Sequence, residues 1–156
     1  MTKPHHRYGF TLIEIVLAVT IIGLLAAFIV PAAKLALRSR ENAQAASKLR
    51  QAVAVFELYR SENGSYPADK NPGEIPPEMT DYFADMKITN WWSSATELGG
   101  NWDWDNGYHF KYSVSISAPT KSTVQLTEFD RLIDDGNLAT GKFRQSGTQY
   151  HYILEQ

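Results

Sequence analysis

The chain has 156 residues and a mass of 17.6 kDa, a size that suits one ordinary domain and excludes most multidomain enzymes. Its 15 Lys and Arg residues against 17 Asp and Glu give a formal net charge of −2, which argues against a dedicated nucleic-acid binder. The absence of cysteine excludes disulfides, thiolate nucleophiles and Cys-ligated zinc. The mean hydropathy of −0.31 averages over an uneven distribution of apolar residues.

One long apolar segment lies near the amino terminus. Residues 10–30 read FTLIEIVLAVTIIGLLAAFIV, close to the roughly 20 apolar residues that span a bilayer as a helix. Lys3 and Arg7 precede it, so the positive-inside rule predicts a cytoplasmic amino terminus and a carboxy-terminal part across the membrane. The run is longer than the core of a secretory signal peptide and continues into Pro31, although its composition also allows cleavage at Ala33.

Glu14 is the only ionisable side chain of this segment. A carboxylate in hydrocarbon costs on the order of 3 kcal/mol, so an intramembrane acid suggests a function and requires a partner. The alternative is that Glu14 lies close enough to the end of the segment to reach the lipid headgroups. Because the span holds no basic residue, a partner would be an amine at the start of this chain or of a neighbouring copy.

A short motif surrounds Glu14. Gly9, Phe10 and Glu14, behind a basic leader and ahead of an unbroken apolar helix, resemble the processing site of type IV pilins and of type II secretion pseudopilins. The resemblance implies that a prepilin peptidase cleaves between Gly9 and Phe10 and methylates the new amine of Phe10. It also implies that Glu14 pairs with the amino terminus of an adjacent subunit. Gly23 and Pro31 match positions where the helix loosens in assembled filaments, in keeping with their low helix propensities.

The helix is predicted to continue after Pro31. Residues 34–60 contain no Gly or Pro, and apolar residues recur there at helical spacing. This stripe consists of Ala45, Leu49, Ala52, Phe56 and Tyr59. Three cations just past the apolar segment, Lys34, Arg38 and Arg40, allow contact with anionic headgroups, but a solvated helix face is the simpler interpretation. Gly64 and Pro67 are typical of a helix end.

The next segments are shorter. Residues 68–77 are dense in Pro, Gly and charge and predict a loop, and residues 78–86 predict one or two helical turns with Met79, Phe83 and Met86 on one face. All four tryptophans lie between residues 91 and 104. We interpret this stretch as an irregular loop whose indoles pack against a small sheet. A stacking platform for a sugar or a base is the alternative.

Residues 108–117 predict a strand, because apolar residues alternate with polar ones and indicate one buried and one solvated face. His109 falls on the solvated face, and His151 is expected to do so in the matching run at residues 150–154. Two exposed histidines on neighbouring strands allow a metal site, but a plain surface position is the simpler interpretation. Between the strands, residues 122–135 predict a short helix that begins with a capping box.

Two pairs of acids are candidate calcium ligands. Asp103 and Asp105 alternate as at the start of a calcium loop, although the rest of that spacing is missing and a turn explains them as well. Asp134 and Asp135 end the predicted helix, where they oppose its dipole. The resemblance implies a calcium site here, because major pseudopilins hold calcium in a carboxy-terminal acidic loop.

Together these features predict an α+β, pilin-like fold: a long amino-terminal helix, half transmembrane and half amphipathic, packed on a small antiparallel sheet. The predicted organisation is a leader at residues 1–9, a transmembrane and filament-core helix at 10–33, its amphipathic continuation at 34–63 and a periplasmic head at 64–156. We expect a subunit of a pseudopilus or pilus-like filament at the bacterial inner membrane, with no cofactor other than calcium. Its partners would be prepilin peptidase, other pilin subunits and the assembly platform.

The alternative is a membrane-tethered periplasmic domain that binds polysaccharide or DNA. An enzyme is not expected, because the sequence contains no Gly-x-Ser-x-Gly elbow, no phosphate-binding glycine loop and no paired-carboxylate signature.

Overall fold

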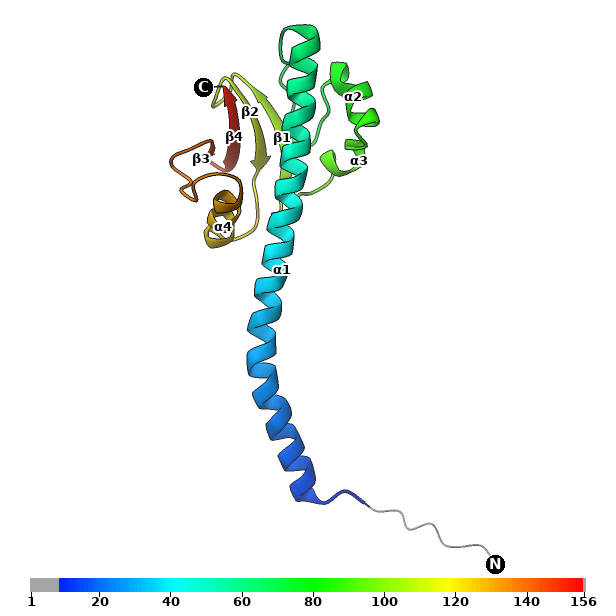
Figure 1. Cartoon of the computed structure of the whole chain (residues 1–156), viewed down its shortest axis with the longest axis vertical. Coiled ribbons are helices and arrows are strands. Elements are labelled where there is room, and N and C mark those ends of the chain that lie inside the picture. The colour runs from blue at the N-terminus through cyan, green and yellow to red at the C-terminus, as the bar shows by residue number, and fades with distance from the viewer. Residues whose placement is uncertain (1–8, 156) are drawn as a thin grey trace, which may run out of the picture. The chain divides into compact units, whose positions relative to one another are not determined.

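The computed structural model describes residues 9–155 (Figure 1). It divides into two compact units, one that ends at Leu37 and one that begins at Arg38. The elements in chain order are α1 (Leu12–Asn63), the 3-10 helix η1 (Pro77–Met79), α2 (Thr80–Asp85), α3 (Thr89–Trp92), β1 (Asn101–Asn106), β2 (Tyr112–Ser117), α4 (Thr123–Ile133), β3 (Phe143–Ser146) and β4 (Gln149–Glu155).

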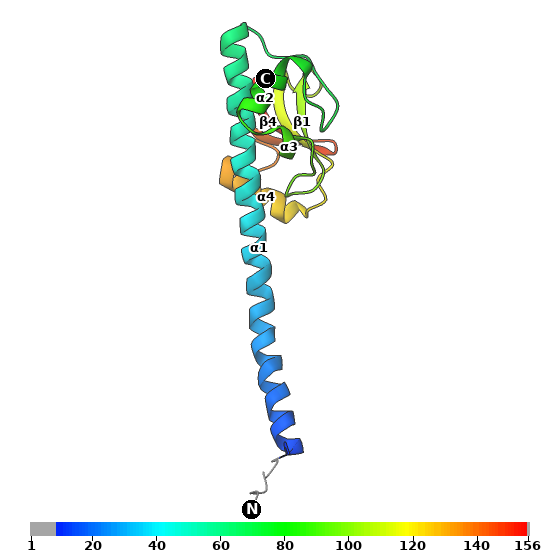
Figure 2. The same cartoon turned by 90° about the vertical axis from the view of Figure 1, so that its right-hand side faces the viewer.

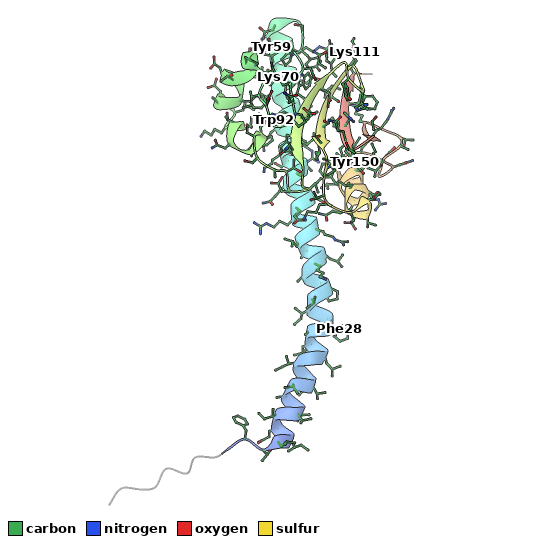
Figure 3. All side chains as sticks on the ribbon, turned by 180° about the vertical axis from the view of Figure 1, so that it is seen from behind. Phe28, Tyr59, Lys70, Trp92, Lys111 and Tyr150 are labelled. Atoms are coloured by element: carbon green, nitrogen blue, oxygen red, sulfur yellow. The ribbon has the colours of Figure 1, made fainter. Side chains whose placement is uncertain are left out.

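The first unit contains the amino-terminal turns of α1, which continue through Gly23 and Pro31 without interruption. Every side chain from Gly9 to Leu37 is exposed, and Phe28 projects freely from the ribbon in Figure 3. Among the described residues, α1 is the one helix that is long and apolar enough to cross a membrane. The loosening predicted at Gly23 and Pro31 concerns the assembled filament and stays a prediction.

In the second unit, α1 buries one face against the head. Ala45, Leu49, Ala52 and Phe56 of the predicted stripe are buried, and Tyr59 is half-buried, so the predicted stripe is confirmed. The helix ends where Gly64 adopts a positive φ of +77° and its N–H donates to the carbonyl of Arg60 at 2.8 Å. A residue with a side chain is strained in this conformation, which explains why glycine ends the helix.

The sheet has four antiparallel strands in the order β1-β2-β4-β3 (Figures 1 and 2). The central strands β2 and β4 are separated in sequence by α4 and β3. The last strand of the chain, β4, therefore lies between β2 and β3 and joins the two hairpin partners into one sheet. A long helix packed on a small antiparallel sheet is an α+β architecture, as predicted.

Aromatic side chains fill the space between α1 and the sheet. Phe56 of α1 stacks on Trp104 of β1 with ring centroids 4.0 Å apart and an interplanar angle of 11°. Trp92, Trp102 and Trp104 are fully buried, and the indole N–H of Trp104 donates to the carbonyl of Pro67 at 3.2 Å. The indoles therefore pack in the core, as we interpreted them, and Figure 3 shows Trp92 within the head.

The prediction of an irregular loop at residues 91–104 was wrong, because its end belongs to β1. Tryptophan and aspartate alternate in NWDWDN with the period of a strand, and both faces of this strand are buried. The apolar–polar alternation was therefore present in the sequence, but the cluster of tryptophans beside Gly99 and Gly100 led to the prediction of a loop.

The strand predicted at residues 108–117 begins only at Tyr112. Gly107 adopts a positive φ of +86°, and its N–H donates to the carbonyl of Lys111 at 3.0 Å. This hydrogen bond closes a loop at residues 107–111. Tyr108, predicted to be buried, is therefore 73% exposed. Ser113 and Ser115, predicted to be solvated, are fully buried because this face of the sheet is also covered.

The short helices agree with the sequence in outline. Residues 77–85 form η1 and α2, with Met79 and Phe83 buried, but Met86 is 44% exposed rather than on their face. The predicted helix at residues 122–135 is α4, and the hydroxyl of its N-cap Ser122 accepts from the Gln125 N–H at 3.4 Å.

Candidate functional site

The predicted processing site lies just before α1. Gly9 and Phe10 are outside the helix and exposed, and the ring of Phe10 is 84% exposed. The bond between them is therefore free of packing within the described chain. Lys3 and Arg7, on which the predicted orientation depends, lie outside the described residues.

Glu14 forms a capping box with Thr11 at the start of α1. Its Oε2 accepts from the backbone N–H of Thr11 at 2.7 Å and from the Thr11 hydroxyl at 2.8 Å. In return, Thr11 Oγ1 accepts from the Glu14 N–H at 3.3 Å. Two N–H groups that a helix start leaves without partners are thereby satisfied.

Only one carboxylate oxygen of Glu14 is used in this way. Within the described residues, Oε1 accepts no hydrogen bond, so it is available to a donor from another molecule. Thr11 was not predicted from the sequence, although the spacing Thr-x-x-Glu is the known signature of this cap.

A second cluster lies where α4 ends. One ligand atom each of Asp130, Asp134 and Asp135 lie within 4.8 Å of one another. Asp134 Oδ2 accepts from the N–H groups of Lys142 and Phe143, and Asp135 accepts from Asn137 N and the Thr140 hydroxyl. The structure thus brings the predicted Asp134 and Asp135 together and adds Asp130, one helical turn before Asp134, which the sequence analysis missed.

Asp130 is the unusual member of this cluster, which we call the α4 acidic cluster. Its side chain is fully buried and neither carboxylate oxygen makes a hydrogen bond of standard geometry in the described chain, although the backbone N–H groups of Gly136 and Asn137 lie close enough to lower its pKa. Burial and the nearby charges of Asp135 and Asp134 raise the pKa of Asp130 to about 6. Carboxylates and backbone carbonyls are the ligands that calcium prefers, so the donors present fit a hard cation.

Asp103 and Asp105 do not join the α4 acidic cluster. Both lie in β1 on the face opposite Trp102 and Trp104, and both are buried. Asp105 Oδ2 lies 3.3 Å from Nδ1 of His151 in β4. Among the described residues, the only group of three or more potential metal ligands is the α4 acidic cluster, so the structure offers less support for calcium at Asp103 and Asp105.

The prediction that His151 is exposed was wrong, since its side chain is fully buried. The loop at residues 107–111 covers it: the rings of His109 and Phe110 lie 5.0 and 5.3 Å from its ring. His109 itself is exposed, as predicted. A loop that folds back over the strand cannot be inferred from alternation along the strand.

Ser113, His151 and Asp105 resemble a catalytic triad in composition but not in geometry. The Ser113 hydroxyl lies 3.0 Å from Nδ1 of His151, the same nitrogen that faces Asp105. In a serine–histidine–acid triad the nucleophile and the acid use different ring nitrogens. These buried residues therefore form a structural polar network.

Asp103 is the most perturbed group of this network. Burial first, then the charges of Asp105 and Asp69, raise the pKa of Asp103 to about 8. Gln149 donates one hydrogen bond to its Oδ2 at 3.1 Å, while Oδ1 has no partner in the described chain.

The fold and its amino-terminal site together define a class of protein. An α+β head packs on a long helix, and the first part of this helix exposes an apolar surface with one carboxylate, Glu14, in its first turn. A family model of the prokaryotic N-terminal methylation motif matches residues 4–30. The match confirms the predicted resemblance over this segment and supports a type IV pilin-like or pseudopilin-type protein, a structural family not known to be enzymatic. No curated protein and no solved structure matches the chain.

The raised pKa of Asp103 predicts a specific dependence of stability on pH. The folded chain keeps the Asp103 proton up to about pH 8, whereas the unfolded chain releases it near pH 4. Between these values the native state binds more protons, so Asp103 makes the free energy of unfolding fall as pH rises, by at most about 1.4 kcal/mol per pH unit.

We expect Asp103→Asn to remove this contribution, because an amide can still accept from Gln149 without ionising. In urea unfolding of the full chain in detergent, the stability of Asp103→Asn relative to wild type should increase from pH 4 to pH 8. Exposed Asp81→Asn is the control and should show no such trend. A constant difference between Asp103→Asn and wild type over this range would contradict the prediction.

Proposed function

We propose that this chain is a structural subunit of a pseudopilus or type IV pilus-like filament. Prepilin peptidase cleaves it between Gly9 and Phe10 and methylates Phe10. The amino terminus faces the cytoplasm, the head lies in the periplasm, and the inner-membrane assembly platform adds the subunit to a filament through α1. The observation that carries the proposal is the fully exposed apolar surface at Gly9–Leu37, which coincides with the matched methylation motif.

Glu14 supports this function through its geometry. Its Oε2 closes the capping box with Thr11, and its Oε1 is left for the methylated amine of Phe10 in a neighbouring subunit. A carboxylate that is already positioned by its own helix loses little conformational freedom when it pairs, and in an apolar surrounding a charge pair is strongly directional. Glu14 thereby sets the register between adjacent helices.

The alternative, a tethered domain that binds polysaccharide or DNA, has less support. Its sequence basis was a stacking platform of tryptophans, but Trp92, Trp102 and Trp104 are fully buried. A buried indole cannot stack on a ligand. The negative net charge also disfavours the phosphate backbone of DNA.

Processing is the first test. In cells with an active prepilin peptidase, mass spectrometry of the membrane-extracted protein should show loss of residues 1–9 and one added methyl group on Phe10. Gly9→Leu, placed directly at the scissile bond, should prevent the loss. An intact amino terminus in the wild-type chain would refute the proposed function.

The role of Glu14 is tested by two substitutions that separate its functions. Glu14→Gln keeps an acceptor for Thr11 but removes the charge, whereas Glu14→Leu removes both. We expect either variant to insert in the membrane as wild type does, and each to lower incorporation into sheared filaments by about tenfold, equivalent to about 1.4 kcal/mol. Normal incorporation of Glu14→Gln would show that the charge does not set the register.

We further propose that the α4 acidic cluster holds calcium through Asp130, Asp134 and Asp135. The fully buried Asp130 carboxylate, which makes no hydrogen bond of standard geometry in the described chain and lies beside two further carboxylates, supports this assignment. A bound cation would offset the mutual repulsion of the three acids and fix the segment that joins α4 to β3.

Calcium should therefore stabilise the head. At a hundredfold excess over its dissociation constant the ion adds about 2.7 kcal/mol to the free energy of unfolding. We expect a chelator to lower the melting temperature of wild type, and Asp130→Asn to abolish the response. Asp103→Asn, outside the cluster, should retain it. A melting temperature that a chelator leaves unchanged in wild type would remove this proposal.

A further inference from the structure

Two grooves flank α1 within the head, and they differ in charge. The first, of about 170 Å³, lies between α1 and the elements α4 and β4, and is lined by Leu49, Arg50, Val53, Ala54, Ile133 and Tyr152. The second, of about 390 Å³, lies between α1 and α2, and is lined by Leu58, Glu62, Asp81, Tyr82, Asp85 and Met86. We call them the basic flank and the acidic flank.

The two flanks lie on different sides of the buried face of the helix. At about 100° per residue, Arg50 and Val53 fall on one side of the buried Phe56, and Leu58 and Glu62 fall on the other. Figure 1 shows the same arrangement, with α4 and the sheet on one side of α1 and α2 with α3 on the other. One head therefore presents both surfaces at once, in different directions.

The basic flank combines apolar side chains with cations. Arg50 is exposed on α1, and Nζ of Lys142 lies 6.0 Å from the centre of the Tyr152 ring. Neither cation makes an ion pair within the described part of the chain. The neighbouring acid Asp134 already accepts hydrogen bonds from two backbone N–H groups.

The acidic flank combines apolar side chains with three carboxylates. Leu58 is 41% exposed and Met86 is 44% exposed. Glu62, Asp81 and Asp85 are exposed, and none has a cation within ion-pair distance among residues 9–155. Tyr82 donates to Glu62 at 2.6 Å and so holds that carboxylate at the edge of the groove.

We propose that the basic flank of one copy docks against the acidic flank of a second copy of this chain. The apolar lining is half-buried around Ala54 in the basic flank and exposed at Leu58 and Met86 in the acidic flank. Each flank also carries charges without an ion pair in the described chain, of the sign that the other lacks, so charge complementarity selects the partner. Because the joined surfaces are different, the contact is heterologous and leaves one free flank at each end. Such a contact propagates along a helix unless its rotation closes a ring.

This inference rests on the proposed function, since it names the head-to-head contact of the same filament. It differs from the contact at Glu14, which lies in the first unit of the chain. The two can therefore fail separately.

Cysteine cross-linking tests the contact directly, because the chain has no cysteine of its own. Two tagged full-length copies are produced together with prepilin peptidase and the assembly platform, one with Ala54→Cys and one with Asp85→Cys. A bifunctional maleimide should link the two tags in a single band. The matched control replaces Ala54→Cys with Thr148→Cys, which is also exposed but lines neither groove, and should give no link.

Charge reversal tests the electrostatic selection. Arg50→Glu with Lys142→Glu, or Asp81→Lys with Asp85→Lys, should each lower the yield of the cross-link and of filaments by about tenfold. The chain that carries all four substitutions should recover most of both, while its melting temperature stays that of wild type. Glu128→Lys, a charge change in α4 outside both flanks, should leave both yields unchanged.

Three outcomes would overturn the docking proposal: filaments that form without the 54–85 link, a 54–54 link in its place, or reversals that are not rescued by their combination. A link from position 85 to a different protein would overturn it as well. Loss of the cross-link together with an uncleaved amino terminus in wild type would instead refute the proposed function.

Discussion

The apolar first part of α1, whose side chains are all exposed within its own chain, must be covered by other molecules. From Gly9 to Leu37 no side chain of α1 is buried, although this stretch is the most apolar part of the sequence. Exposed apolar surface of this extent is not stable in water. Such a surface is stable in a bilayer or against neighbouring apolar helices, in keeping with the proposed membrane anchor and filament.

In the second unit, the later part of the same helix is a core element of the head. Phe56 stacks on Trp104, and Ala45 and Ala52 are fully buried in the same hydrophobic core. Because the core includes α1 itself, the head is attached to the helix by packing and not only by a linker. A force or constraint applied to the head thus reaches the helix backbone directly.

The sequence predicted best what depends on local chemistry. The buried stripe on α1, the helix end at Gly64 and the cap at Ser122 each follow from residues a few positions apart, and each is confirmed. The apolar segment with Glu14 was recognised for the same reason. Two predictions were wrong: residues 101–106 were predicted as a loop although they alternate as a strand does, and His151 was predicted to be exposed.

The burial of the polar side chains of the sheet depends on segments that are distant in the sequence. The strands carry a polar face with Asp103, Asp105, Ser113 and His151, which alternation assigns to solvent. In the structure the loop at residues 107–111 lies against His151, and Asp69 lies close enough to influence Asp103. Asp130 was missed in the same way, because its burial depends on what packs around the end of α4. In each case a segment distant in sequence covers a polar side chain, and periodicity along the chain does not indicate such contacts.

In the proposed filament, the physics of the bilayer requires more than the apolar helix for assembly. Lipid tails are as apolar as leucine, so two helices in a membrane gain no hydrophobic free energy by meeting. Apolar packing alone would then neither favour the filament over dispersed subunits nor fix one register. Directional polar contacts can do both: Glu14 offers one at the start of α1, and the oppositely charged flanks offer others where water is displaced. In the proposed filament, these two kinds of contact, separated along a single helix, would specify both the axial register and the lateral neighbour of each subunit.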